Sequence, residues 1–262
     1  MVEVPVKLYL DKVLKTAREV VRPFSLITGP VREKALRGMA AALAEAEESI
    51  LAANEKDVDA VGKSMTGYEN RERVRDAVAR VRMTADDVKA IVDRLHRIAD
   101  LPDPLGEVVG RHDEPNGLQV GRVRVPIGVI GIVSELAPLE TIDAVALCLK
   151  SGNVCVFRGS PDWSLTQQTI AACLSTAAAE AGIPSGACTI IDRPEKEAAL
   201  ELIKSGKALD AIIPRGGAGL RKVVQEQAKM PILCHDGGIT HVYIDGDVDI
   251  PMAQNIVVNS KV

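Results

Sequence analysis

The 262-residue chain lacks the features that would direct it to nucleic acid or a membrane. It has one Trp, three Tyr and two Phe, and its formal charge of −4 provides no basic surface, which argues against nucleic-acid binding. No apolar run is long enough to cross a bilayer, and residues 1–15 lack the basic region and apolar core of a signal peptide. The sequence therefore predicts a folded globular protein, in which an anionic ligand would have to be held by local groups.

The chain also lacks any cysteine pattern typical of zinc sites or disulfide frameworks. There is no CxxC pair and no His at zinc-ligand spacing, so no metal site is predicted. The cysteines lie in or beside apolar runs, which favours reduced thiols in a cytosolic core over a functional role. They are Cys148, Cys155, Cys173, Cys188 and Cys234.

The first hundred residues show helical spacing. Apolar side chains recur every three to four residues between Val31 and Ala99, with charged residues on the opposite face. Thr84 and Asp87 resemble a capping box that begins the last of these helices. The sequence predicts an N-terminal helical layer over residues 1–105, which LPDP at 101–104 brings to an end.

Residues 106–125 predict a β-hairpin. Two short runs, EVVGRH and LQVGRVRV, flank the Asn116–Gly117 dipeptide, which is typical of hairpin turns. A projecting hairpin would suit pairing with another copy of the chain, so a homo-oligomer is expected. The alternative is an edge hairpin that packs on the chain's own sheet.

Residues 126–262 alternate short apolar runs with helical stretches. Strands that are apolar on both faces and alternate with helices predict an α/β fold with a doubly wound parallel sheet. In such sheets ligands bind beyond the carboxyl ends of the strands. The predicted strands are GVIGIV, VCVF, ACTII, ALDAIIP and THVYI, and the predicted helices are 141–150, 165–181, 195–204 and 219–228.

Two segments place phosphate-binding groups at that edge. Arg158 and Ser160 follow the second strand and offer a cation and a hydroxyl, although Arg158 could instead pair with a helix carboxylate. Arg215, Gly216 and Gly217 follow the fourth strand and open a helix, where backbone amides can approach a pyrophosphate. These five residues are the predicted cofactor-binding set.

The pair His235–Asp236 precedes the predicted strand THVYI. Such a pair could perform acid–base work, but a loop histidine is more often structural. No serine lies in a nucleophile elbow.

Read together, LCLKSGN at 147–153, FRGS at 157–160, IIPRGGAGL at 212–220, LPDPLGEV, PNGL and HVYID resemble the γ-glutamyl phosphate reductase (glutamate-5-semialdehyde dehydrogenase) family of the aldehyde dehydrogenase superfamily. The resemblance implies a Rossmann-like NADP-binding domain, a hairpin used in oligomerisation, and proline biosynthesis as the setting. It implies γ-glutamyl phosphate and glutamate-5-semialdehyde as substrate and product, and a cysteine thiolate that forms a thioester before hydride reduction.

The chain departs from the family pattern at positions that matter for catalysis. Asn259–Ser260–Lys261 matches the motif that precedes the family's cysteine, and the sequence stops before that cysteine and the catalytic domain. Ala137 stands where the family has Arg, and Leu139 stands where it has an Asn similar to the oxyanion-stabilising residue. Leucine cannot donate a hydrogen bond, so no catalytic residue is assigned, and Cys234 is a weak substitute for the nucleophile.

Two hypotheses follow. The chain is either the cofactor-binding portion of such a reductase, inactive alone, or a catalytically silent relative that binds NADP or a partner protein. The sequence leaves open which applies, the exact substrate, the preference for NADP over NAD, and the oligomeric state.

Overall fold

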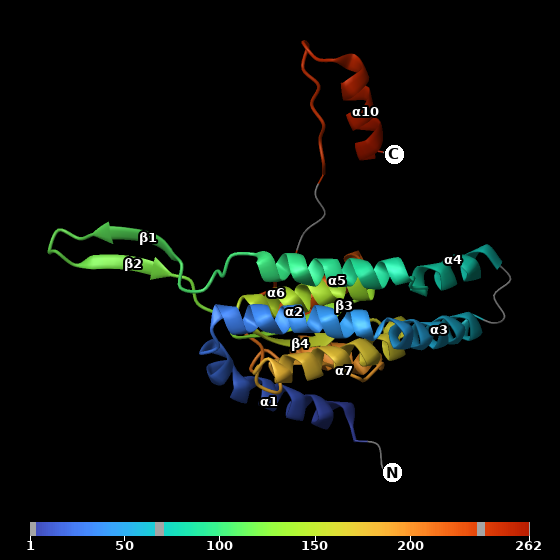
Figure 1. Cartoon of the computed structure of the whole chain (residues 1–262), viewed down its shortest axis with the longest axis horizontal. Helices are drawn as coiled ribbons and strands as arrows, with labels where there is room; N and C mark the ends of the chain where they lie inside the picture. The colour runs from blue at the N-terminus through green and yellow to red at the C-terminus, as the bar shows by residue number, and fades with distance from the viewer. Residues whose placement is uncertain (1–3, 66–70, 235–238, 262) are drawn as a thin grey trace.

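The computed structural model describes residues 4–65, 71–234 and 239–261. Helices α1 to α5 come first, then the two strands β1 and β2, then an alternation of strands and helices, and finally the separate helix α10 (Figure 1). The N-terminal helices are α1 (Val6–Ser25), α2 (Gly29–Glu45), α3 (Glu47–Ser64), α4 (Arg71–Val81) and α5 (Ala85–Asp100).

The alternating segment forms a four-stranded parallel sheet in the order β5-β4-β3-β6. β3 and β4 are buried at every residue, as expected for a sheet covered on both faces. The elements are β3 (Val129–Ser134), α6 (Pro138–Lys150), β4 (Val154–Arg158), the short 3-10 helix η1 (Pro161–Trp163), α7 (Ser164–Glu180), β5 (Cys188–Ile190), α8 (Lys196–Lys204), β6 (Ala211–Arg215) and α9 (Ala218–Gln227).

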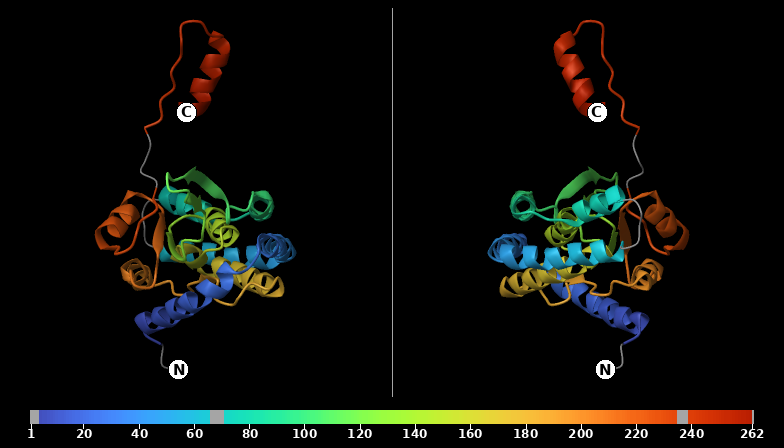
Figure 2. Two further views of the ribbon diagram at one scale, coloured as in Figure 1. Left: turned by 90° about the vertical axis from the view of Figure 1, so that its left-hand side faces the viewer. Right: turned by 90° about the vertical axis from the view of Figure 1, so that its right-hand side faces the viewer.

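The order of the strands places the helices on both faces. From β3 the chain moves outward to β4 and β5, and then returns to the far side of β3 as β6. Right-handed crossovers therefore place α6 and α7 on one face and α8 on the other. α2, α3 and α5 pack outside α6 and α7, and α1 contacts both α8 and the sheet, which gives the layered arrangement seen in Figure 2. The predicted helical layer and doubly wound sheet are confirmed.

The motif LKSGN ends α6 and sets the position of β3. Gly152 adopts a φ of +70°, and Asn153 N donates to Cys148 O at 2.8 Å, which closes the helix end. Asn153 Oδ1 then accepts from Ile127 N at 2.6 Å and Gly128 N at 3.0 Å. The motif thus fixes where the first strand of the sheet begins.

Residues 106–125 form the predicted hairpin from β1 (Val108–Asp113) and β2 (Gln119–Val123). Its turn is closed by Gly117 at φ +84°, with Glu114 N donating to Leu118 O at 2.8 Å. The two strands form a sheet of their own and project from the body of the molecule (Figure 1). The alternative, packing on the chain's own sheet, is excluded.

The prediction of a strand at THVYI is wrong. Residues 240–244 have no assigned strand structure, and Tyr243 is 85% exposed. A β-prone run becomes a strand only where a neighbouring strand accepts its hydrogen bonds, and this segment leads away from the sheet (Figure 1). The segment continues into α10 (Ile250–Lys261), a helix that the sequence reading did not foresee and that has no buried residues.

None of the described helices is both long enough and apolar enough to cross a membrane.

The first turn of α7 is capped from a distant helix. Asp57 of α3 is 4% exposed and accepts from Leu165 N at 3.1 Å, Thr166 N at 2.8 Å and Thr166 Oγ1 at 2.7 Å. Trp163, the residue before α7, makes no side-chain cap of its own. Asp57 therefore satisfies the free amides of α7 and holds it against α3.

We predict that Asp57→Ala lowers the free energy of unfolding by about 1–3 kcal/mol, because it leaves buried donors without an acceptor. Asp59→Ala is the matched control, since Asp59 is an exposed residue of the same helix, and its effect should stay within about 0.5 kcal/mol. Urea denaturation of both variants checks this. Equal losses would contradict the assigned role of Asp57.

Candidate nucleotide-binding site

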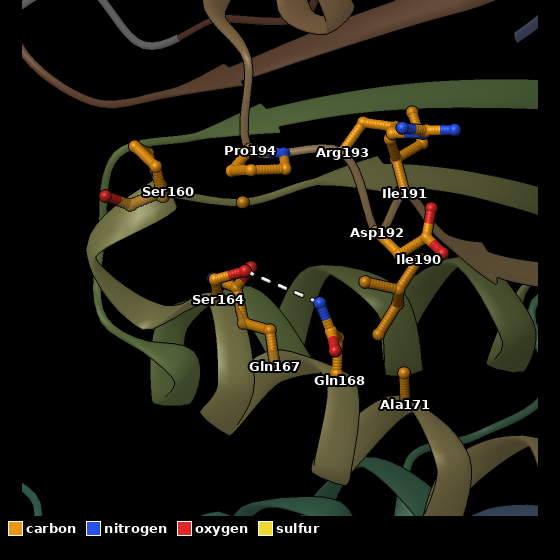
Figure 3. Close-up of a pocket in the computed structure, with 12 residues that line it drawn as sticks. Ser160, Ser164, Gln167, Gln168, Ala171, Ile190, Ile191, Asp192, Arg193 and Pro194 are labelled. Atoms are coloured by element: carbon orange, nitrogen blue, oxygen red, sulfur yellow. Dashed lines mark hydrogen bonds between the residues drawn. The ribbon is translucent and has the colours of Figure 1, made fainter. Parts of the chain in front are cut away.

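The carboxyl ends of β4 and β5 border a pocket of about 240 Å³ (Figure 3). Ser160 comes directly after β4 and caps η1, accepting from Asp162 N at 3.3 Å. Figure 3 shows the opposite side formed by the segment that follows β5, with α7 beneath. The lining residues include Ser160, Ser164, Gln167, Gln168, Ile191 and Asp192.

Gly159 makes room for a side chain of α7 at one end of this pocket. A Cβ at this position would collide with the side-chain amide of Gln167 on α7. The close approach of β4's end to α7 therefore depends on a missing side chain. It brings Ser160 and Gln167 to the same pocket.

Arg158 lies at the predicted edge, but the residue is only 6% exposed and its guanidinium donates to backbone carbonyls. Nη2 donates to Pro194 O at 2.8 Å and Glu195 O at 3.2 Å, which ties β4 to the loop before α8. Burial lowers the pKa of Arg158, while the charges of Glu195 and Glu135 oppose that shift. The guanidinium thus orients the segment that lines the pocket, and a phosphate contact stays a prediction.

The second predicted segment lies at the carboxyl end of β6. Strand order reverses between β3 and β6, which is where open α/β sheets bind ligands. Glu135 after β3 donates its backbone N to Arg215 O at 2.8 Å, and its Oε2 accepts from Gly217 N at 3.3 Å. The N-terminus of α9 therefore already donates a backbone N–H to an anionic oxygen, that of Glu135.

Gly216 and Gly217 play different roles in this loop. A Cβ at Gly216 would lie 2.6 Å from Glu135 Oε2, so a side chain there would displace the carboxylate from its present position. At Gly217 an added Cβ would meet nothing within 4 Å, which leaves that amide open on one side. The glycines carry no side chains of their own here, and the Gly217 amide is taken by the Glu135 carboxylate in this structure.

Three buried N–H groups in this region have no acceptor among the described residues. They are Arg158 Nε at the end of β4, Gln167 Nε2 on α7 and Arg215 Nε at the end of β6. Unpaired buried donors cost free energy, and of these three residues Gln167 lines the pocket. An oxygen-rich ligand bound there would supply the missing acceptor. This chemistry fits the phosphates and ribose of a nucleotide.

The pocket includes residues that the sequence reading did not assign. Gln167 and Gln168 come from α7, and Asp192 and Arg193 follow β5. Arg193 also lies over the ring of Tyr9, with its Cζ 5.3 Å from the ring centroid. The rule that selected Arg158 and Ser160, polar residues directly after a predicted strand, would also have selected Asp192 and Arg193.

A model of the aldehyde dehydrogenase family matches residues 7–262. The chain belongs to the aldehyde dehydrogenase family.

Within the family, its relatives are named gamma-glutamyl phosphate reductase. The relative from Moorella thermoacetica is 40% identical over 245 residues, which cover 94% of this chain and 57% of that protein. The relative from Parvibaculum lavamentivorans is 40% identical over 259 residues, which cover 98% of this chain and 59% of that protein. The chain thus spans somewhat under three fifths of the length of these relatives.

A solved structure supports the same likeness. The crystal structure of gamma-glutamyl phosphate reductase from Thermotoga maritima superposes with a TM-score of 0.86 at 30% identity, over 96% of this chain and 59% of that one. The enzyme of that name from Saccharomyces cerevisiae superposes with a TM-score of 0.75 at 25% identity, over 95% of this chain and 62% of that one. The predicted resemblance and the aldehyde dehydrogenase-like fold are confirmed.

The two positions where the sequence analysis expects a departure from the family pattern lie at the start of α6. Ala137 precedes the helix and Leu139 is in its first turn, and both are partly buried apolar side chains packed against the core. Neither side chain carries a hydrogen-bond donor. Their apolar packing leaves the loop after β3 without side-chain donors at these two places.

The cysteines lie as the sequence reading placed them. Cys148 and Cys173 are on helices and Cys155 and Cys188 on strands, while Cys234 is exposed. A hydrogen bond to Cys148 and burial raise the pKa of Cys155 well above its usual range, and burial raises that of Cys188 to about 12. Thiols of this kind stay protonated at neutral pH and are poor nucleophiles.

His235 and Asp236 lie outside the described residues, so their predicted alternatives stay open. A role for Cys234 also stays a prediction.

Proposed function

We propose that the chain is the cofactor-binding portion of a γ-glutamyl phosphate reductase, and that the pocket between β4 and β5 holds the adenosine half of NADPH. The observation that carries the proposal is a pocket at the carboxyl edge of a parallel sheet, lined by Ser160 and by Gln167, whose Nε2 has no acceptor among the described residues. The family membership supports a nicotinamide cofactor, which supplies hydride when bound.

Each predicted residue has a part in this proposal. Ser160 and Gln167 line the adenosine pocket, and Arg158 holds the loop at Pro194 beside it. A pyrophosphate at Gly216 and Gly217, with Arg215 beside them, would take the place at the Gly217 amide that the Glu135 carboxylate holds in this structure. Arg193, which lines the pocket, favours the extra phosphate of NADP over NAD, and the charge of Arg158 lies behind the loop at Pro194.

The substrate and setting are carried over from the relatives. We propose γ-glutamyl phosphate as the substrate of the whole reductase, glutamate-5-semialdehyde as its product, and proline biosynthesis as its pathway. A cytoplasmic location fits the five cysteines, all of which are free thiols in the structure.

A second function, a catalytically silent relative that binds NADP or a partner protein, is favoured by the apolar residues Ala137 and Leu139. Oxyanion stabilisation needs hydrogen-bond donors, and these side chains have none. The two functions share the cofactor pocket and differ in whether the assembled protein turns over substrate.

We predict that Ala171→Leu weakens NADPH binding by about tenfold or more, because Ala171 lines the adenosine pocket and the larger side chain would fill it. Ala172→Leu is the matched control one residue along α7, outside that pocket, and should bind like the parent. Calorimetric titration of the full chain measures both. A parent that does not bind NADPH would overturn the proposal, and a parent that binds NADH equally well would overturn only the preference for NADP.

A second prediction separates the enzyme from the silent relative. We expect a fusion of this chain with the remaining portion of a relative to turn over substrate weakly. Leu139→Asn should raise the rate of the fusion by about 10²-fold or more, since one oxyanion donor contributes about that factor. The assay follows NADPH formation from glutamate-5-semialdehyde. Wild-type fusion activity equal to that of the Asn variant would show that position 139 is not the oxyanion site.

We further propose that the β1–β2 hairpin mediates self-association, because Val108, Val109 and Val123 are exposed on an arm that does not pack on the chain's own sheet. Sedimentation velocity should show a species larger than the monomer, and replacing residues 106–125 by a short glycine linker should abolish it. An unchanged assembly after this replacement would contradict the role of the hairpin.

A further inference from the structure

A second hollow lies away from the carboxyl edge, between α1 and the segment from α8 to β6. Its volume is about 730 Å³, and its lining carries six basic side chains against two acidic ones, Asp11 and Glu201. This balance is opposite in sign to the formal charge of the whole chain, −4. The basic residues are Lys7, Lys15, Arg18, Lys204, Lys207 and Lys229.

Two of these cations are already paired. Arg18 forms a two-pronged ion pair with Asp210, with Nη1 to Oδ2 at 2.6 Å and Nη2 to Oδ1 at 3.0 Å. Lys15 lies 4.0 Å from Glu19 on the same helix. Arg18 is therefore a structural residue in the floor of the groove, and Lys15 contributes only part of its charge.

The other four are exposed and form no ion pair within the described part of the chain. Lys7 lies on α1, and Lys204, Lys207 and Lys229 form a lysine triad on the opposite wall. The triad is held together by Gly206, where a Cβ would lie 2.7 Å from Lys229 Cβ and 3.1 Å from its backbone. The glycine lets the Lys229 segment pack directly on the turn that carries the other two lysines.

An interaction with the C-terminus of α8 accounts for the position of only one of these lysines. Lys204 is in the last turn of α8, where a cation interacts favourably with the helix C-terminus. Lys207, Lys229 and Lys7 lie outside that helix. Like charges brought together on neighbouring segments repel one another, and an anion in the groove would relieve this repulsion.

The side-chain chemistry favours phosphate over other anions. Lysine ammonium groups are compact point charges that bind phosphate without fixed geometry, whereas the arginine fork binds carboxylate and phosphate alike in a fixed two-pronged geometry. Several separate ammonium groups therefore suit an anion that carries several charges along its length. The one arginine here is taken up by Asp210. No aromatic side chain is among the described lining residues, so nothing is present to stack a base.

We propose that this groove is a binding site for a chain of linked phosphates, free of a nucleoside, with the lysine triad as its main cationic wall. The site is separate from the nucleotide pocket, because the two share no lining residue.

The experiment is calorimetric titration of the full chain with inorganic tripolyphosphate at low ionic strength. The triple variant Lys204→Gln, Lys207→Gln, Lys229→Gln should bind at least about tenfold more weakly than the parent, and raising the salt should reduce the parent's affinity more steeply than the variant's. The control, Lys34→Gln, Lys56→Gln, Lys89→Gln, removes the same charge from exposed lysines elsewhere and should bind like the parent.

Two further titrations locate the ligand. Tripolyphosphate should bind equally well when NADPH is saturating, and ATP should bind no more tightly than tripolyphosphate. Loss of binding in the presence of NADPH, binding of ATP alone, equal losses in the two triple variants, or no binding by the parent would each overturn the proposal. NADPH binding by the lysine variant reports separately on the nucleotide pocket.

Discussion

The strands β3 and β4 are buried along their whole length, and a buried parallel strand is stable only if helices cover both of its faces and every backbone group is paired. The crossover helices α6 and α7 cover one face, and α8 with α1 covers the other. Because all four strands run in the same direction, their carboxyl ends meet at one edge. The residues that follow each strand are therefore brought together there although they are far apart in the sequence.

Buried polar groups keep this sheet in position. Asn153 fixes the start of β3 through Ile127 and Gly128, and Asp210 accepts from Val129 N at 2.8 Å while it pairs with Arg18. At the other edge Arg158 ties β4 to the loop before α8. The motifs that carry the likeness to the reductases are thus partly structural: LKSGN serves the fold, FRGS serves both the fold and the pocket, and PRGG forms the turn from β6 to α9.

Much of this was predictable from the sequence, since periodicity and turn residues act locally. The helices between residues 31 and 99, the hairpin turn at Gly117 and the strands β3 to β6 all follow from such patterns. Contacts between distant segments were not predictable in this way. The cap that Asp57 provides for α7 and the packing of Gly159 against Gln167 depend on which helices become neighbours. THVYI was misread because a strand needs a partner as well as a β-prone sequence.

The central claim is that the pocket between β4 and β5 receives the adenosine half of NADPH. A crystal structure of the chain grown with NADPH tests it most directly. The account predicts that the adenine lies between α7 and the segment at Ile191, with Ser160 and Gln167 in contact with the nucleotide. A nucleotide seated in the groove between α1 and α8, or bound to α10, would contradict it.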